Sequence, residues 1–358
     1  MKKIAFLLAI VMIVTSLSAC SYIFPDEHPG QTGQPGQNET PNDGPKLVEK
    51  DILFDRNFEN GIKISSLNSH QVGYTWWQYG ATDVSEPFWS LGQYCDLSTT
   101  RANYDSTKND LSLGNELFEI PAYGIQGQDG DYYTLTNASG SKYISVNTKT
   151  GECNLNIDTT KEYINQQTGD PVVRKNGEDW VHMIIQQTPG VVYLDQVESF
   201  IMELDFTITE NIEYDNSIGA SQFQWVFTVH DKASVLGDYM WFNVTLFDNR
   251  FEIFPGTQLY DGGKADSTGK FIYAPKGDEL FPETGGKVEV GKTYHVRIDL
   301  KEYMKAAFDL AQSKGALAQS EWENMAVNGF NIGWEVSNLA KVGVKIENMS
   351  LRVVEYEK

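Results

Sequence analysis

The chain has 358 residues, with 49 Asp and Glu against 28 Lys and Arg and a formal net charge of −21 at pH 7. So acidic a chain lacks the basic surface that neutralises phosphates, which excludes nucleic acid as an expected partner. Polyanionic polysaccharides are disfavoured for the same reason, whereas neutral ligands and Ca²⁺ suit the charge. No motif requires a cofactor or a metal site, although a structural Ca²⁺ ion is compatible with this composition.

The N-terminus has the features of an export signal. Two lysines precede an apolar run over residues 4–14, which is too short to span a membrane comfortably. The four residues Leu17, Ser18, Ala19 and Cys20 resemble the lipobox of bacterial lipoproteins, in which the cysteine is diacylated and becomes the mature N-terminus. The resemblance implies a signal peptide over residues 1–19. It also implies an exported lipoprotein, anchored in a lipid bilayer through acylated Cys20 and facing away from the cytoplasm.

Residues 20–46 follow as a segment dominated by Pro, Gly, Gln and Asn. Such a segment buries too little apolar surface to offset its ordering entropy, so a disordered tether is expected. After Cys20, Cys95 and Cys153 are the remaining cysteines, and they could pair or stay free.

An aromatic-rich stretch over residues 74–94 comes early in the folded part. Consecutive Trp76 and Trp77 on a strand must point to opposite sides. We therefore expect Trp89 and one member of this pair in the core, and the other member at the rim of a groove.

Period-two alternation of apolar residues is the clearest signal in the chain from residue 47 onward. It predicts half-buried antiparallel strands at 200–208, 223–230, 239–247 and 294–300. Shorter candidate strands are 62–66, 132–136, 142–146, 181–187, 250–254, 330–336, 342–346 and 350–356. The predicted core contains Phe206, Phe227, Phe242, Val296, Ile298 and Trp334.

One helical passage interrupts the strands. Residues 303–314 are rich in helix formers and end at Gly315, and Ser320 with Glu323 matches a capping box for a short second turn. We expect an insert near residues 301–326 that covers a sheet edge or an open end of a sandwich.

This sequence of short strands with one helix predicts a two-sheet sandwich. From about residue 180, and most clearly over residues 330–356, the chain resembles the concanavalin A-like jelly rolls of secreted bacterial carbohydrate-active proteins, both lectins and glucanases. The expected fold class is all-β: a two-sheet antiparallel jelly-roll sandwich over residues 47–358, with a possible subdivision near 170–180. A monomer is expected.

The outward-facing alternates of these strands mix Trp, Tyr, His, Gln, Asn and Arg. A sugar ring needs a flat aromatic for its C–H face and polar side chains for its hydroxyl rim. We expect Trp241 to be the aromatic plate, assisted by Asn243, Gln224, Arg297, Asp205 and one of Trp76 and Trp77. If the insert or the N-terminal segment covers this face, Trp241 becomes a core residue instead.

The expected function is a cell-surface lipoprotein that binds a neutral polysaccharide or oligosaccharide. One alternative is a glycoside hydrolase, because residues 203–208 resemble the Glu-x-Asp-x-(x)-Glu strand of laminarinase-like enzymes. Glu203 and Asp205 match its first two acids, but the third acid is missing. A polysaccharide lyase is a further alternative, using His182, Gln186, Tyr239 and Arg297. A surface assembly protein without a sugar site is the last.

Overall fold

The computed structural model describes residues 46–65, 74–79, 86–92, 124–165, 167–175, 180–262 and 268–357. The predicted signal peptide, Cys20 and the tether up to residue 45 lie outside the described residues. Residues Pro45–Lys358 form one compact unit. Among the described residues, no helix has both the length and the apolar character needed to cross a membrane.

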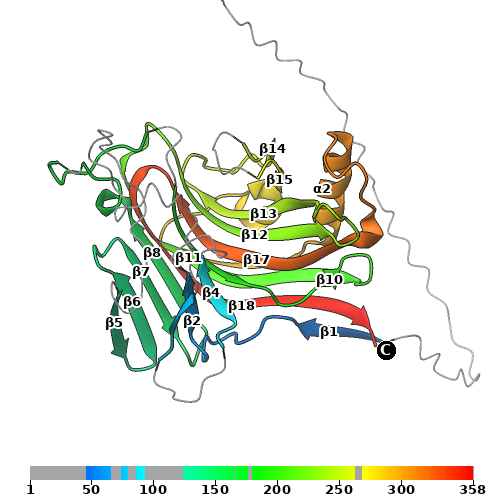
Figure 1. The fold of residues 1–358 in the computed structure, drawn as a ribbon, viewed down its shortest axis with the longest axis horizontal. Coiled ribbons are helices and arrows are strands. Elements are labelled where there is room, and N and C mark those ends of the chain that lie inside the picture. Colours follow the sequence, from blue (N-terminus) through cyan, green and yellow to red (C-terminus); the bar gives the residue numbers. More distant parts are fainter. Residues whose placement is uncertain are drawn as a thin grey trace, which may run out of the picture. The chain divides into compact units, whose positions relative to one another are not determined.

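Two stacked β-sheets make up this unit (Figure 1). Sheet A has eight strands, which in spatial order are β16 (Thr293–Asp299), β11 (Ser199–Asp215), β18 (Leu339–Tyr356), β8 (Cys153–Asp158), β7 (Lys142–Asn147), β6 (Tyr132–Asn137) and β5 (Gly124–Asp129), with β1 (Leu47–Asp51) paired to β18.

Sheet B has ten strands. Their order is β14 (Thr257–Tyr260), β15 (Phe271–Ala274), β13 (Tyr239–Asp248), β12 (Ser221–Asp231), β17 (Met325–Val336), β9 (Val181–Gln187), β4 (Trp89–Gly92), β2 (Ile62–Ser65) and β3 (Tyr74–Trp77), with β10 (Val192–Tyr193) paired to β17. The expected all-β jelly-roll sandwich is confirmed. Two pairs within sheet B, β2 with β4 and β13 with β15, are parallel rather than antiparallel.

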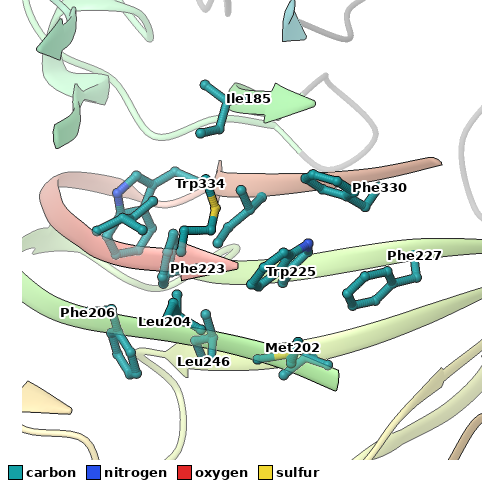
Figure 2. Packing of buried hydrophobic residues seen from close by; sticks show 14 of the residues in the cluster. Ile185, Met202, Leu204, Phe206, Phe223, Trp225, Phe227, Leu246, Phe330 and Trp334 are labelled. Atoms are coloured by element: carbon teal, nitrogen blue, oxygen red, sulfur yellow. The ribbon is translucent and has the colours of Figure 1, made fainter. Parts of the chain in front are cut away.

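The core lies between the two sheets and is built from the apolar alternates of both. Figure 2 shows Met202, Leu204 and Phe206 of β11 facing aromatic side chains of β12 and β17. Of the predicted core residues, Ile298 is half-buried and the others are buried: Phe206, Phe227, Phe242, Val296 and Trp334. The indole Nε1 of Trp334 on sheet B donates a hydrogen bond to the Leu155 carbonyl of sheet A at 3.1 Å, which ties the sheets together.

Two of the strand predictions are wrong, each for a local reason. Residues 250–254 form turns rather than a strand, because the Asp248 carboxylate accepts a hydrogen bond from the Arg250 backbone N–H at 3.1 Å and closes an Asx-type turn. Predicted strands 342–346 and 350–356 are one long strand, β18, which passes through Asn348 at φ 52°. Asparagine tolerates this left-handed backbone better than most residues, so the strand continues across it.

The helical insert is confirmed, and it contains α2 (Lys301–Ser313) and the 3-10 turn η6 (Trp322–Asn324). Helix α2 contacts β11 of sheet A and β13 of sheet B, and buries Met304, Ala307, Phe308 and Ala311. It therefore covers an end of the sandwich where the two sheets meet. The predicted capping box at Ser320 is wrong, because Glu321 holds the N-cap position of η6 and its side chain makes no capping bond. Further short helices within the described residues are α1 (Gly277–Leu280), η4 (Thr159–Lys161) and η5 (Pro282–Thr284).

Candidate functional site

The outer face of sheet B carries an open cavity of about 570 Å³, which is called the sheet B groove below. This volume lies within the range of ligand sites in proteins. The groove is lined by Lys63, Glu86, Pro87, Phe88, Ser90, Gln186, Gln187, Thr188, Thr228, Trp241, Asn328, Gly329, Phe330 and Asn331. Its lining therefore combines aromatic rings with amide and hydroxyl side chains. Among these residues the charged ones are Lys63 and Glu86, whose side chains form an ion pair at 2.7 Å.

Strand pairing aligns outward residues of sheet B into a row. Residues directly opposite one another on neighbouring strands point to the same face. The row runs from β13 to β3 through Asn243, Val226, Asn331, Gln186, Ser90, Lys63 and Trp76. With neighbouring strands about 4.8 Å apart, the row spans about 29 Å. The face thus offers a long, mostly polar strip rather than a single small pocket.

Trp241 lies at the β13 side of the groove and is half-buried rather than a core residue. Its indole Nε1 donates to the Thr268 hydroxyl at 3.3 Å, and its ring meets the Tyr239 ring edge-on at 5.2 Å. Tyr239 in turn packs on His230 at 4.9 Å, and partial burial raises the pKa of the Tyr239 phenol. These contacts hold the Trp241 ring in a defined orientation at the groove.

Gln224 is the centre of a polar cluster on the same face. Its amide oxygen accepts hydrogen bonds from Asn243 at 3.2 Å and Thr245 at 3.4 Å, and its amide nitrogen donates to the Glu335 carboxylate at 3.3 Å. The other oxygen of Glu335 lies 3.8 Å from His182 Nε2. The structure therefore brings together three predicted residues, Asn243, Gln224 and His182, with one that the sequence reasoning missed. This set is called the Gln224–Glu335 cluster.

Glu335 could have been found from the sequence. Residues 331, 333 and 335 alternate with buried Ile332, Trp334 and Val336, so Glu335 belongs to the outward face of β17.

Arg297, Asp205 and Glu203 do not belong to this face, and the expectation that they share a groove with Trp241 is wrong. Their strands, β16 and β11, lie in sheet A, whereas β12 and β13 lie in sheet B. Outward residues of the two sheets point away from each other, so the sandwich itself separates the predicted site into two sets.

On sheet A these residues form a network of ion pairs and hydrogen bonds. Arg297 donates to Glu203 at 2.8 Å, and His295 Nδ1 lies 2.7 Å from Asp205. Arg352 donates to Glu49 of β1 at 2.8 Å, and this bond holds the pKa of the Glu49 carboxyl below its usual range. Each acidic side chain here has a basic partner, so the network joins β1, β11, β16 and β18.

The prediction that Trp89 and one of Trp76 and Trp77 lie in the core is confirmed. Trp77 and Trp89 are buried, and Trp89 Nε1 donates to the Asp55 carbonyl at 2.8 Å. Trp76 is 44% exposed and lies directly opposite Lys63, a residue that lines the groove. Trp76 is thus the member of the pair that faces outward.

Within the described ranges, no group of three or more His, Cys, Asp or Glu side chains could hold a metal ion. Cys153 is a free thiol within these ranges, and complete burial raises its pKa. Cys95 lies outside the described residues.

Comparison with known proteins gives matches among solved structures. No protein-family model matches the sequence, and no curated protein matches it. Endoglucanase Cel12A from Rhodothermus marinus is 14% identical, with 65% of this chain and 99% of that chain covered and a TM-score of 0.35. A family 12 xyloglucanase from Bacillus licheniformis is 13% identical, with 65% and 97% covered and a TM-score of 0.36. Endoglucanase 3 from Trichoderma harzianum is 9% identical, with 67% and 100% covered and a TM-score of 0.33. Similarity at this level bears on neither ligand nor activity.

Proposed function

We propose that this protein binds a neutral polysaccharide or oligosaccharide in the sheet B groove. This proposal is based on which residues line the groove. Trp241 and Phe88 can stack on the C–H faces of sugar rings, and Gln186, Asn331 and other polar side chains can bond the hydroxyl rim. The charged lining residues are paired with each other, which suits a neutral ligand better than a uronate.

The Gln224–Glu335 cluster favours binding over hydrolysis. A glycoside hydrolase uses two carboxyl groups, about 5–5.5 Å apart in retaining enzymes and about 6.5–9.5 Å apart in inverting ones. In this cluster, β12 presents the amide of Gln224, rather than a second carboxyl group, to the Glu335 carboxylate. An amide can serve neither as the nucleophile nor as the proton donor. The Glu203 and Asp205 carboxylates, which suggested a hydrolase, lie on the other sheet.

The lyase alternative requires a base and a neutralising group beside the same sugar. His182 and Tyr239 stand on β9 and β13, with β12 and β17 between them, and Arg297 is on sheet A. The described residues therefore do not assemble the predicted lyase set, which leaves binding as the function best supported by the groove.

Replacing Trp241 with alanine tests this function. Stacking on one aromatic ring is worth about 1–3 kcal/mol by analogy with nucleic-acid bases, so we expect affinity to fall by about 5- to 150-fold. A glycan array would identify the ligand, calorimetry would give the affinity in the micromolar to millimolar range, and a reducing-end assay should show no product. Tyr214→Ala, which removes an exposed ring from sheet A, is the matched control and should bind like wild type. Binding that survives Trp241→Ala would contradict the proposed site, and absence of binding to any glycan would favour the assembly role.

We also propose that the protein is an exported lipoprotein, with the glycan-binding unit attached to a membrane through Cys20 and the tether of residues 20–46. The support is the lysine-led apolar segment that ends at the lipobox-like residues 17–20. Metabolic labelling with a clickable palmitate should mark the wild-type protein but not Cys20→Ala. Equal labelling of both would refute the anchor.

A further inference from the structure

A second aromatic surface lies at the side of the groove opposite Trp241. Phe88, which lines the groove, stacks on Phe54 with ring centroids 5.0 Å apart and planes inclined by 30°. Both residues are exposed, Phe54 at 44% and Phe88 at 43%. Single exposed apolar side chains are common, but a stacked pair beside a groove marks a contact surface. This pair is called the Phe54–Phe88 platform.

Gln187, the last residue of β9 in sheet B, holds the platform in place. The Phe54 backbone N–H donates to Gln187 Oε1 at 2.8 Å, and Gln187 Nε2 donates back to the Phe54 carbonyl at 2.9 Å. Gln187 is only 4% exposed, so both bonds are partly buried. The next residue, Asp55, accepts the indole bond of buried Trp89 through its carbonyl. The loop that carries Phe54 is thus held at two consecutive residues. Little conformational entropy would be lost when its ring binds a ligand.

The two aromatic surfaces are far apart along the sheet. Trp241 is on β13, and Phe88 directly precedes β4, with β12, β17 and β9 between these strands. Four inter-strand spacings of about 4.8 Å amount to about 19 Å. Aromatic contacts act over only about 4.5–7 Å between ring centroids, so one sugar ring cannot reach both surfaces. Between them lie the amide and hydroxyl groups of Gln186, Asn331 and Thr228.

We infer that the ligand of the groove is an extended linear glycan, held by Trp241 towards one end and by the Phe54–Phe88 platform towards the other. Gln187 is a positioning residue for the platform. This inference rests on the proposed glycan-binding function and adds the length of the ligand and the residues that select it.

Affinity for a length series of linear neutral oligosaccharides, from disaccharide to hexasaccharide, tests the inference. For the wild-type protein we expect affinity to rise with length and to level off once both surfaces are occupied. Phe88→Ala should lower hexasaccharide affinity by about tenfold while leaving the weak disaccharide binding at Trp241 almost unchanged. Phe251→Ala, which removes a ring of similar exposure (42%) from a residue that does not line the groove, is the control and should follow the wild-type curve.

Gln187 variants test the positioning role separately from the ring itself. Gln187→Met keeps the side-chain volume but removes both bonds to Phe54, and should flatten the length dependence as Phe88→Ala does. Gln187→Glu keeps the acceptor for the Phe54 N–H, so it should retain part of the length dependence that Gln187→Met loses. If Phe88→Ala and Gln187→Met retain the wild-type length dependence while Trp241→Ala loses binding, the inference fails and the proposed function stands. If the wild-type protein binds none of the oligosaccharides in the series and no longer glycan, the function itself fails.

Discussion

Replacing Trp334 with alanine should lower the free energy of unfolding by about 3–5 kcal/mol, as expected for a large buried aromatic side chain. Its ring is fully buried and packs against Phe223 at 5.5 Å and Phe247 at 6.1 Å. The substitution also leaves the Leu155 carbonyl on the opposite sheet without its indole donor. The loss thus combines a cavity with a broken bond between the two sheets.

Chemical denaturation followed by circular dichroism would measure this loss. Trp334→Phe keeps most of the ring but removes the donor, so it should be less destabilising than Trp334→Ala and isolates the hydrogen-bond contribution. Phe251→Ala at an exposed position should change stability by less than about 0.5 kcal/mol. A Trp334→Ala effect below about 1 kcal/mol would mean that the two sheets do not pack as described.

Gly333→Ala is the second substitution with a large expected effect, because β17 and β9 approach closely at this glycine. A Cβ atom there would lie 2.1 Å from the Met183 carbonyl oxygen and 2.7 Å from Ile184 Cα. Both neighbours are backbone atoms, so the strands would have to separate, at a cost of about 1–3 kcal/mol or more. Asn331 and Gln186 are paired two residues away, so we also expect weaker glycan binding.

Gly329→Ala is the matched control on the same strand. Its Cβ would meet Thr188 Oγ1 at 3.7 Å and the Gln187 carbonyl at 3.8 Å, which are ordinary contacts. Denaturation midpoints of the two variants should therefore differ clearly, with Gly329→Ala close to wild type. Equal midpoints would contradict the close approach at Gly333.

Local pattern was enough to predict the longer strands and their inward faces. Met202, Leu204 and Phe206 alternate with polar residues, and side chains of any strand point alternately to its two faces, so these three had to lie on one side together. The same rule required Trp76 and Trp77 to face opposite ways, and the structure shows which of them is buried. Helix formers followed by Gly315 likewise located the insert, because both signals are read within a few residues.

Features that join distant parts of the chain were decided by the tertiary structure. Asp205 and Trp241 are both outward residues of predicted strands, but alternation carries no information about which sheet a strand joins, and pairing placed them on opposite faces. The Phe54–Phe88 platform depends on Gln187, which is 133 residues from Phe54 in the chain. The sequence by itself determined which side chains are inward or outward, since that depends on the local backbone. Which outward side chains meet in one groove depends on strand order, and only the folded sandwich sets that order.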